Sequence, residues 1–110
     1  MTAEIPPGVA IETIYLVEAT YAPDASETRG PARAEHLARV IEMRRAGVLI
    51  EAGGFADFSS AVLLFRTATA EAALAICRDD VYTRCGVWVE LRARAWGRVV
   101  EAGEVPATAS

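Results

Sequence analysis

The sequence predicts an α+β domain in which two helices cover one face of a four-stranded antiparallel sheet. Four segments rich in β-branched and aromatic residues predict strands, and two Ala-rich segments with helical periodicity separate them. The elements follow in the order strand, helix, strand, strand, helix, strand. A length of 110 residues fits a single domain with a modest core.

The first half of the chain predicts a strand, a loop and a long helix. Residues 1–10 contain Pro and Gly and are expected to form a loose lead-in. Ile11–Tyr21 is rich in Ile, Tyr, Val and Thr and predicts the first strand. The turn residues of "APDASETRGPA" predict a loop. Pro31 suits the first turn of a helix that runs to about Ala46, where Gly47 ends it.

The second half predicts three strands and one more helix. "VLIEAGGF" and "AVLLFRT" predict the second and third strands, with the turn "ADFSS" between them. "TAEAALAICRDD" predicts a helix that Thr67 or Thr69 caps. After an irregular turn, "DDVYTRCG", the alternation of Val87–Trp96 predicts the fourth strand. Residues 101–110 lack an apolar pattern, so we expect a disordered tail after a single domain of residues 1–100.

This order of elements is that of the ferredoxin-like β-α-β-β-α-β fold, which leaves one sheet face without helices. The strands are nevertheless apolar on both faces. In the third strand Val62 and Leu64 point to one side, and Leu63 and Phe65 point to the other. A sheet that is apolar on both sides needs two covers, and the helices supply one. We therefore expect a homodimer of the dimeric α/β-barrel type, with the sheets packed face to face.

Composition and charge exclude several classes of partner. The net charge of −4 argues against nucleic acid and acidic membranes, which both reward clustered positive charge. The sequence shows no secretory signal and no apolar run of transmembrane length, so we expect a cytoplasmic protein. One His and two Cys are too few for a typical metal site, and no Gly-rich phosphate loop is present. We expect neither a metal nor a cofactor.

His36 is the only histidine, and helical periodicity places it at the edge of the apolar face of the first helix, half-buried. It is either a boundary residue that bonds a backbone carbonyl or a functional residue, because imidazole exchanges its proton near neutral pH. Arg33, one helical turn earlier, is a candidate for holding an anionic group or a solvated surface residue.

The cysteines and tryptophans are expected to be structural. Cys77 and Cys85 are expected to be free thiols in packing roles, because nothing in the sequence indicates a lowered thiol pKa. Trp88 and Trp96 alternate onto one face of the last strand, which predicts a place in the core or in a dimer interface.

Three segments together resemble the YciI-like (YCII-related) family of small α+β proteins over roughly Ile14 to Val100. "RAEHLARVIEMRRAGVLIEAGG" resembles the family's R-x-x-H-L helix and G-x-L-x-x-A-G strand end. "LLFRTATAEAALAICRDDVY" resembles its strand, helix start and D-P-Y turn, and "GVWVELRARAWGRVV" resembles its closing strand. The chain departs from this pattern where Val81 and Gly54 replace Pro, and where Ala95-Trp96 replaces Pro-Phe.

The resemblance implies a ferredoxin-like fold, a dimer, and a functional pair that falls on His36 and Asp80. An imidazole whose tautomer is set by a carboxylate can take or give a proton. We therefore expect a cofactor-independent enzyme that moves a proton on a small molecule, in an isomerase-, lyase- or hydrolase-like step. The alternatives are a non-catalytic module that binds a small metabolite and a protein with an assembly role alone. The expected substrate-binding residues are Arg33, Tyr82, Gly53 and Ser60.

Overall fold

The computed structural model describes residues 4–104 of the chain. It contains four strands, two long helices and two helices of a single turn. In chain order these are β1 (Val9–Tyr21), α1 (Ala25–Thr28), α2 (Gly30–Arg45), β2 (Leu49–Gly54), β3 (Ser60–Phe65), α3 (Ala70–Arg78), α4 (Val81–Arg84) and β4 (Trp88–Glu101).

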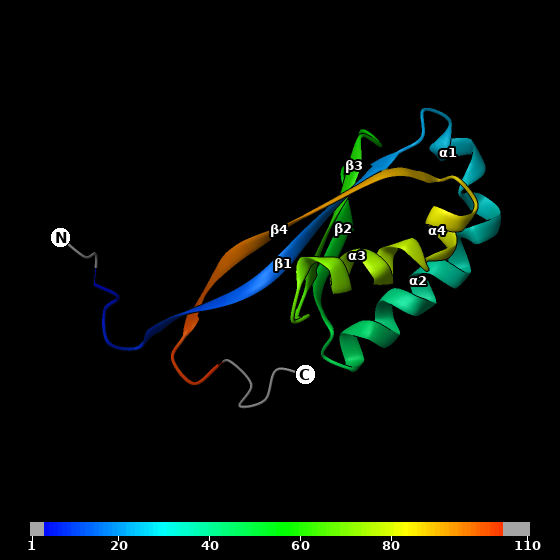
Figure 1. Cartoon of the computed structure of the whole chain (residues 1–110). Helices are drawn as coiled ribbons and strands as arrows, with labels where there is room; N and C mark the ends of the chain where they lie inside the picture. Colours follow the sequence, from blue (N-terminus) through cyan, green and yellow to red (C-terminus); the bar gives the residue numbers. More distant parts are fainter. Residues whose placement is uncertain (1–3, 105–110) are drawn as a thin grey trace.

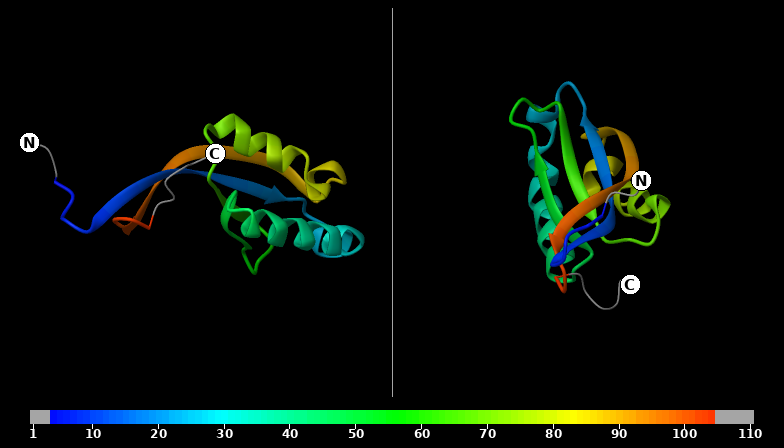
Figure 2. Two further views of the ribbon diagram at one scale, coloured as in Figure 1. Left: turned by 90° about the horizontal axis from the view of Figure 1, so that it is seen from below. Right: turned by 90° about the vertical axis from the view of Figure 1, so that its left-hand side faces the viewer.

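The strands form one antiparallel sheet in the order β2-β3-β1-β4. The helices α2 and α3 lie in one layer in front of this sheet (Figures 1 and 2). The predicted fold class is therefore confirmed: an α+β chain with a four-stranded antiparallel sheet and helices on one face. No helix within residues 4–104 is long and apolar enough to cross a membrane.

The core lies between the helices and the sheet. Leu63 and Phe65 of β3 are buried there together with Val17 of β1, and Ala73 and Cys77 of α3 close over them. Val62 and Leu64, which alternate with them along β3, are only partly buried and face the other side of the sheet. The two-sided pattern predicted for this strand is confirmed.

The outer strands are longer than the sequence predicts. β1 begins at Val9 rather than Ile11, and β4 continues past Trp96 to Glu101. Over residues 9–14, β1 pairs with β4 alone, and the two strands form a ribbon that extends away from the helices (Figure 1). In this ribbon the backbone groups of β1 and β4 bond to each other, so the strands continue without a strong apolar pattern. The sequence pattern therefore does not predict their full length. Residues 105–110 of the predicted tail lie outside the described residues.

The two tryptophans do not share a face, contrary to the prediction. A register shift in the β1–β4 pairing places Trp88 opposite Tyr21, whereas Trp96 lies opposite Ile14. Trp88 is 3% exposed in the core, and Trp96 is 44% exposed on the far side of the sheet. A β-bulge adds one residue to a strand and so reverses its alternation, which the regular sequence pattern cannot show.

The face of the sheet opposite the helices, called here the open face, carries apolar side chains. The strand register aligns Leu16 with Leu64, and their neighbours Val62 and Trp96 project to the same side. No residue between 4 and 104 is placed as a second layer over this face, as Figure 2 shows. The open face matches the surface for which the sequence predicts a second cover.

Candidate active site

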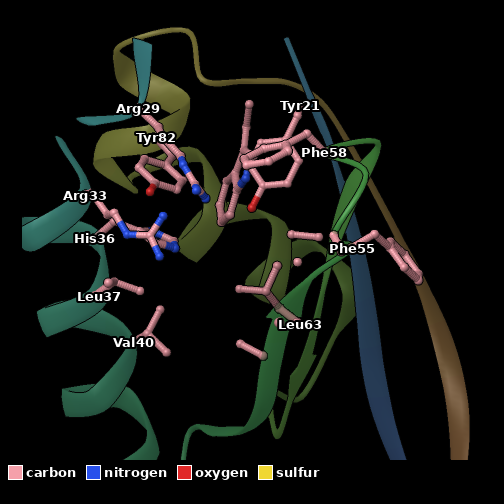
Figure 3. Close-up of a pocket in the computed structure, with 16 residues that line it drawn as sticks. Tyr21, Arg29, Arg33, His36, Leu37, Val40, Phe55, Phe58, Leu63 and Tyr82 are labelled. Carbon is pink, nitrogen blue, oxygen red and sulfur yellow. The ribbon is translucent and has the colours of Figure 1, made fainter. Parts of the chain in front are cut away.

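A cavity of about 290 Å³ lies between α2, the β2–β3 hairpin and the adjoining ends of β1 and β4 (Figure 3). Its polar side includes two arginines and the only histidine, which are Arg29, Arg33 and His36. The aromatic residues that line it are Tyr21, Phe55, Phe58, Tyr82 and Trp88, of which Phe55 turns its ring outward (Figure 3).

One side of α2 faces this cavity because of helical spacing. Arg33, His36, Leu37 and Val40 recur at intervals of three and four residues, which places them on one face of a helix. Arg29, immediately before the helix, continues the same row. Helical spacing alone therefore explains which side chains line this side of the cavity.

His36 and Asp80 form a buried hydrogen-bonded pair beside the cavity. His36 Nδ1 donates to Asp80 Oδ1 at 2.8 Å, and the two residues are 7% and 2% exposed. An ionised carboxylate only accepts hydrogen bonds, so the shared proton resides on Nδ1. The remaining ring nitrogen, Nε2, is then the one that can exchange a proton with a molecule in the cavity.

Asp80 is held in place by its position at the start of α4. It is the N-cap of that single turn, and its Oδ1 also accepts the backbone N–H of Tyr82 at 2.9 Å. The guanidinium of Arg39 lies 3.8 Å from the other carboxylate oxygen, Oδ2. The backbone of α4 and the Arg39 side chain of α2 thus both hold the Asp80 carboxylate in place. The fixed carboxylate in turn orients the imidazole of His36.

Two aromatic rings surround the imidazole. Tyr82 stacks on His36 with 3.8 Å between ring centroids, and Trp88 lies edge-on to His36 at 5.1 Å. Burial raises the pKa of the Tyr82 phenol, so this hydroxyl is protonated at neutral pH and can donate a hydrogen bond. The indole N–H of Trp88 is buried and has no hydrogen-bond partner within residues 4–104.

The prediction of a half-buried His36 is wrong, because Asp80, Tyr82 and Trp88 enclose the ring from other parts of the chain. The structure places Arg33, Tyr82 and Gly53 on the cavity wall. Ser60 lies elsewhere: its hydroxyl donates to Glu18 at 3.1 Å. Ala61 lines the cavity, and alternation along β3 turns the preceding serine to the opposite face.

Sequence reasoning missed Arg29, Phe58 and Tyr21. Arg29 lies in the segment predicted as a loop, although its spacing of four residues from Arg33 was an available signal. Phe58 belongs to the β2–β3 hairpin loop, and Tyr21 ends β1. Both reach the cavity only through strand pairing, and strand pairing leaves no local sequence signal.

The two cysteines lie in different environments. Cys77 is buried in the core, and burial, together with the nearby Asp80 carboxylate, raises the pKa of its thiol to about 12. The thiol of Cys77 therefore stays protonated and is a poor nucleophile. Cys85 is exposed. Among the described residues, no three His, Cys, Asp or Glu side chains are grouped to hold a metal ion.

Comparison with known proteins bears on the fold. No family model matches the sequence, and no curated protein matches it. The structure is similar to 5-chloro-2-hydroxyhydroquinone dehydrochlorinase (TftG) from Burkholderia phenoliruptrix AC1100, in complex with 2,5-dihydroxybenzoquinone. The TM-score is 0.63 with 16% sequence identity, over 76% of this chain and 92% of that one. This likeness establishes the fold that the two chains share, and the resemblance to YciI-like proteins stays a prediction.

Proposed function

We propose that this chain is a small-molecule enzyme in which His36, oriented by Asp80, moves a proton on a ligand bound in the cavity. The observation that carries the proposal is the buried hydrogen bond between these two side chains at the cavity wall. A carboxylate on Nδ1 sets the tautomer and stabilises the positive charge that forms when Nε2 takes a proton. Membership of the YciI-like family, which the sequence motifs suggest, is part of the same proposal.

The reaction we favour is a cofactor-independent elimination, with isomerisation and a hydrolysis-like step as related classes. In an elimination, His36 Nε2 removes a proton from a carbon or a hydroxyl group of the substrate, the electron pair forms a double bond, and an anion such as chloride leaves. The protein of similar fold is a dehydrochlorinase, which makes this class the first to test. The protonated Tyr82 hydroxyl and the Arg33 guanidinium are the groups suited to hold a negatively charged substrate oxygen.

The first experiment compares His36→Gln with the parent protein on chlorinated hydroxyhydroquinones, measuring chloride release and quinone absorbance. Arg45→Gln is the matched control, because Arg45 ends the same helix, is exposed and lies outside the cavity. We expect the His36 variant to lose about 10²–10⁴-fold in rate, the usual contribution of general acid–base catalysis, while the control keeps its rate. Equal rates in the parent and the His36 variant would contradict the proposal.

The second candidate function is a non-catalytic module that binds a small metabolite in the same cavity. In that case the His36–Asp80 pair acts as a structural hydrogen bond only. A binding measurement by calorimetry on the same compounds separates the two functions: saturable binding by the parent protein without product from any compound of the series supports the binding module.

We also propose a homodimer that buries the open face. Trp96 is 44% exposed there, and its neighbours Leu16, Val62 and Leu64 are only partly covered. A second copy of the same apolar surface is the simplest cover. Sedimentation at micromolar concentration is expected to show a dimer for the parent chain and a monomer for the double variant Leu64→Glu, Trp96→Glu. A monomeric parent chain would end this proposal.

A further inference from the structure

The mouth of the cavity holds two arginines that no described carboxylate neutralises. Most arginines of the chain form ion pairs, as Arg66 and Arg98 do with Glu12 and Arg92 does with Glu18. Within residues 4–104, Arg29 and Arg33 form none. Figure 3 shows both side chains reaching toward the space between α2 and the hairpin. In a chain of net charge −4, this local excess of positive charge favours an anionic ligand.

Arg29 is held in position by Phe58. The guanidinium carbon of Arg29 lies 4.4 Å from the centroid of the Phe58 ring, a cation–π contact. Within residues 4–104 the Arg29 guanidinium forms no ion pair, so its N–H groups are available to a ligand. The ring of Phe58 also lies edge-on to Tyr21, with 6.1 Å between centroids.

The backbone of Phe58 is unusual for its residue type. Its φ of 60° lies in the left-handed region, which bulky side chains rarely adopt because of the steric cost. Asp57 and Ser59 stabilise the turn on either side of Phe58, because the Asp57 carboxylate accepts the backbone N–H and the hydroxyl of Ser59. The hairpin therefore maintains a strained conformation that brings an aromatic ring against Arg29.

The rest of the cavity suits a flat ring. Tyr21, Phe58, Tyr82 and Trp88 contribute aromatic surface, and Gly53 adds no side chain. A volume of about 290 Å³ is at the small end for a ligand cavity and suits a single ring with small substituents.

We infer that the cavity selects a planar one-ring anion, a ring carboxylate or phenolate, and that Arg29, positioned by Phe58, binds its anionic group together with Arg33. The inference rests on the proposed function, since this anion would be the substrate on which His36 acts. Arg33 and His36 lie one helical turn apart, so a ring held by its anionic group at the mouth extends toward the imidazole.

The test measures binding of benzoate and of 2,5-dihydroxybenzoquinone by calorimetry. Benzamide serves as a neutral probe of the same shape, and cyclohexanecarboxylate as a non-planar anion. We expect saturable binding of the planar anions. Benzamide is expected to bind at least about tenfold more weakly, because it lacks the charge that strengthens hydrogen bonds to arginine. Cyclohexanecarboxylate is expected to bind several-fold more weakly, because its puckered ring cannot stack on the aromatic side chains. No saturable binding of either planar anion, or equal binding of benzamide and benzoate, would overturn the inference.

The variants Arg29→Gln and Phe58→Leu test the two parts of the arrangement. Arg29→Gln is expected to weaken benzoate binding about tenfold and to reduce the preference over benzamide, since Arg33 remains. Phe58→Leu keeps both charges and is expected to weaken binding less. Arg45→Gln is the matched control, because Arg45 is exposed, lies outside the cavity and the open face, and forms no ion pair with the described carboxylates. Arg29→Lys keeps the charge and is expected to retain part of the affinity. If Arg29→Lys binds benzoate, the loss in Arg29→Gln reflects the missing charge and not a folding defect.

The inference and the proposed function fail in different ways. If Arg29→Gln binds benzoate as well as Arg45→Gln does, the arginine site is wrong, whatever the turnover of His36→Gln. If benzoate binding depends on Arg29 while His36→Gln keeps full turnover, the anion site stands and the catalytic role of His36 is wrong. His36→Gln is expected to bind benzoate with affinity within a few-fold of the parent protein.

Discussion

The imidazole of His36 lies parallel to the phenol ring of Tyr82, with 3.8 Å between centroids and 11° between planes. One residue organises this stack. Asp80 accepts the hydrogen bond of the imidazole and the backbone N–H of Tyr82 through the same oxygen. The sequence Asp-Val-Tyr therefore places the Asp80 carboxylate and the Tyr82 ring on the single turn of α4. The helix α2 brings His36 into contact with both.

The Tyr82 ring, rather than its hydroxyl, is expected to position the imidazole. Protons above an aromatic ring resonate upfield, so the His36 ring signals of the parent protein should be shifted upfield in the proton NMR spectrum. Tyr82→Phe should keep this shift, whereas Tyr82→Leu should lose it and cost about 2 kcal/mol or more in unfolding free energy. Because His36 is the only histidine, its signals need no further assignment. An unshifted His36 signal in the parent protein would contradict the stacked geometry.

Val81→Pro is expected to be neutral or to stabilise the chain by about 0.5–1 kcal/mol. Val81 is the first residue of α4, where the helix does not use the backbone N–H that proline lacks. Asp80 before it has the extended backbone that a following proline requires (φ −69°, ψ 143°). The control is Thr83→Pro, which removes the bond from Thr83 N–H to the Asp80 carbonyl and should cost about 3 kcal/mol. Denaturant midpoints measure both, and a loss for Val81→Pro as large as for Thr83→Pro would contradict the assignment of the cap.

Gly54 is required to be glycine by the side chain of Tyr21. A Cβ at residue 54 would lie 2.8 Å from the Tyr21 hydroxyl oxygen, so Gly54→Ala must displace that ring and is expected to cost about 1–2 kcal/mol. At the neighbouring Gly53 a Cβ meets no atom within 4 Å, and Gly53→Ala should change stability by less than about 0.5 kcal/mol. Thermal unfolding of the pair is the measurement, and equal effects would refute the close approach of Tyr21 to β2.

Glu12 is expected to make stability depend on pH in the acid range. Its hydrogen bond from Arg66, aided by Arg98 and opposed by burial, holds the pKa of this carboxyl below its ordinary value of 4.5. A carboxyl with a depressed folded pKa stabilises the fold above its unfolded pKa, and the stabilisation is lost as the pH falls through the folded pKa. Glu12→Gln should therefore cost about 2 kcal/mol at pH 7, and the cost should shrink progressively below about pH 4.5.

The control for this effect is Glu71→Gln, which removes an exposed ion pair with Arg78. It should change stability by less than about 0.5 kcal/mol at either pH. Urea unfolding at pH 7 and near pH 3 compares the variants. A Glu12→Gln penalty that is the same at both pH values would show that the charge of Glu12 contributes nothing.

Iodoacetamide is expected to distinguish the two cysteines. The pKa of Cys77 is raised from 9.0 to about 12, which reduces its reactive thiolate by roughly 10³-fold at pH 8, and its side chain is buried. Cys85 is exposed and should be alkylated in the native protein. Mass spectrometry should show one modification on the native chain and two in denaturant, with Cys85→Ser unmodified until it unfolds. Rapid native labelling of Cys77 would contradict its place in the core.

Much of the fold was predictable because it follows from local periodicity. The alternation of Leu63 and Leu64 predicted both faces of β3, and the interval between Arg33 and His36 predicted one face of α2. The resemblance to YciI-like proteins directed attention to Asp80. Its hydrogen bond to His36 joins residues 44 positions apart and had no local signal.

Two of the errors have a common cause in the sheet. Trp88 and Trp96 were expected on one face, but the register shift beside Tyr21 separates them. Ser60 was expected at the site, yet the alternation along β3 turns it away, toward Glu18. Both depend on which residues of another strand lie opposite, and this is settled only when the whole sheet forms.

The sequence by itself determined the order of the four strands and the two longer helices, the fold class and the apolar character of both sheet faces, since these depend on side-chain periods within single segments. The single-turn helices α1 and α4 lie in segments that were predicted as a loop and an irregular turn. Only the tertiary structure decided that His36 is buried against Asp80, Tyr82 and Trp88, and that Arg29 and Phe58 meet at the mouth of the cavity. The physical reason is that burial and hydrogen-bond partners are properties of contacts between distant segments. A helix can place an imidazole on one of its faces, but the neighbouring turn and strand determine what that imidazole contacts.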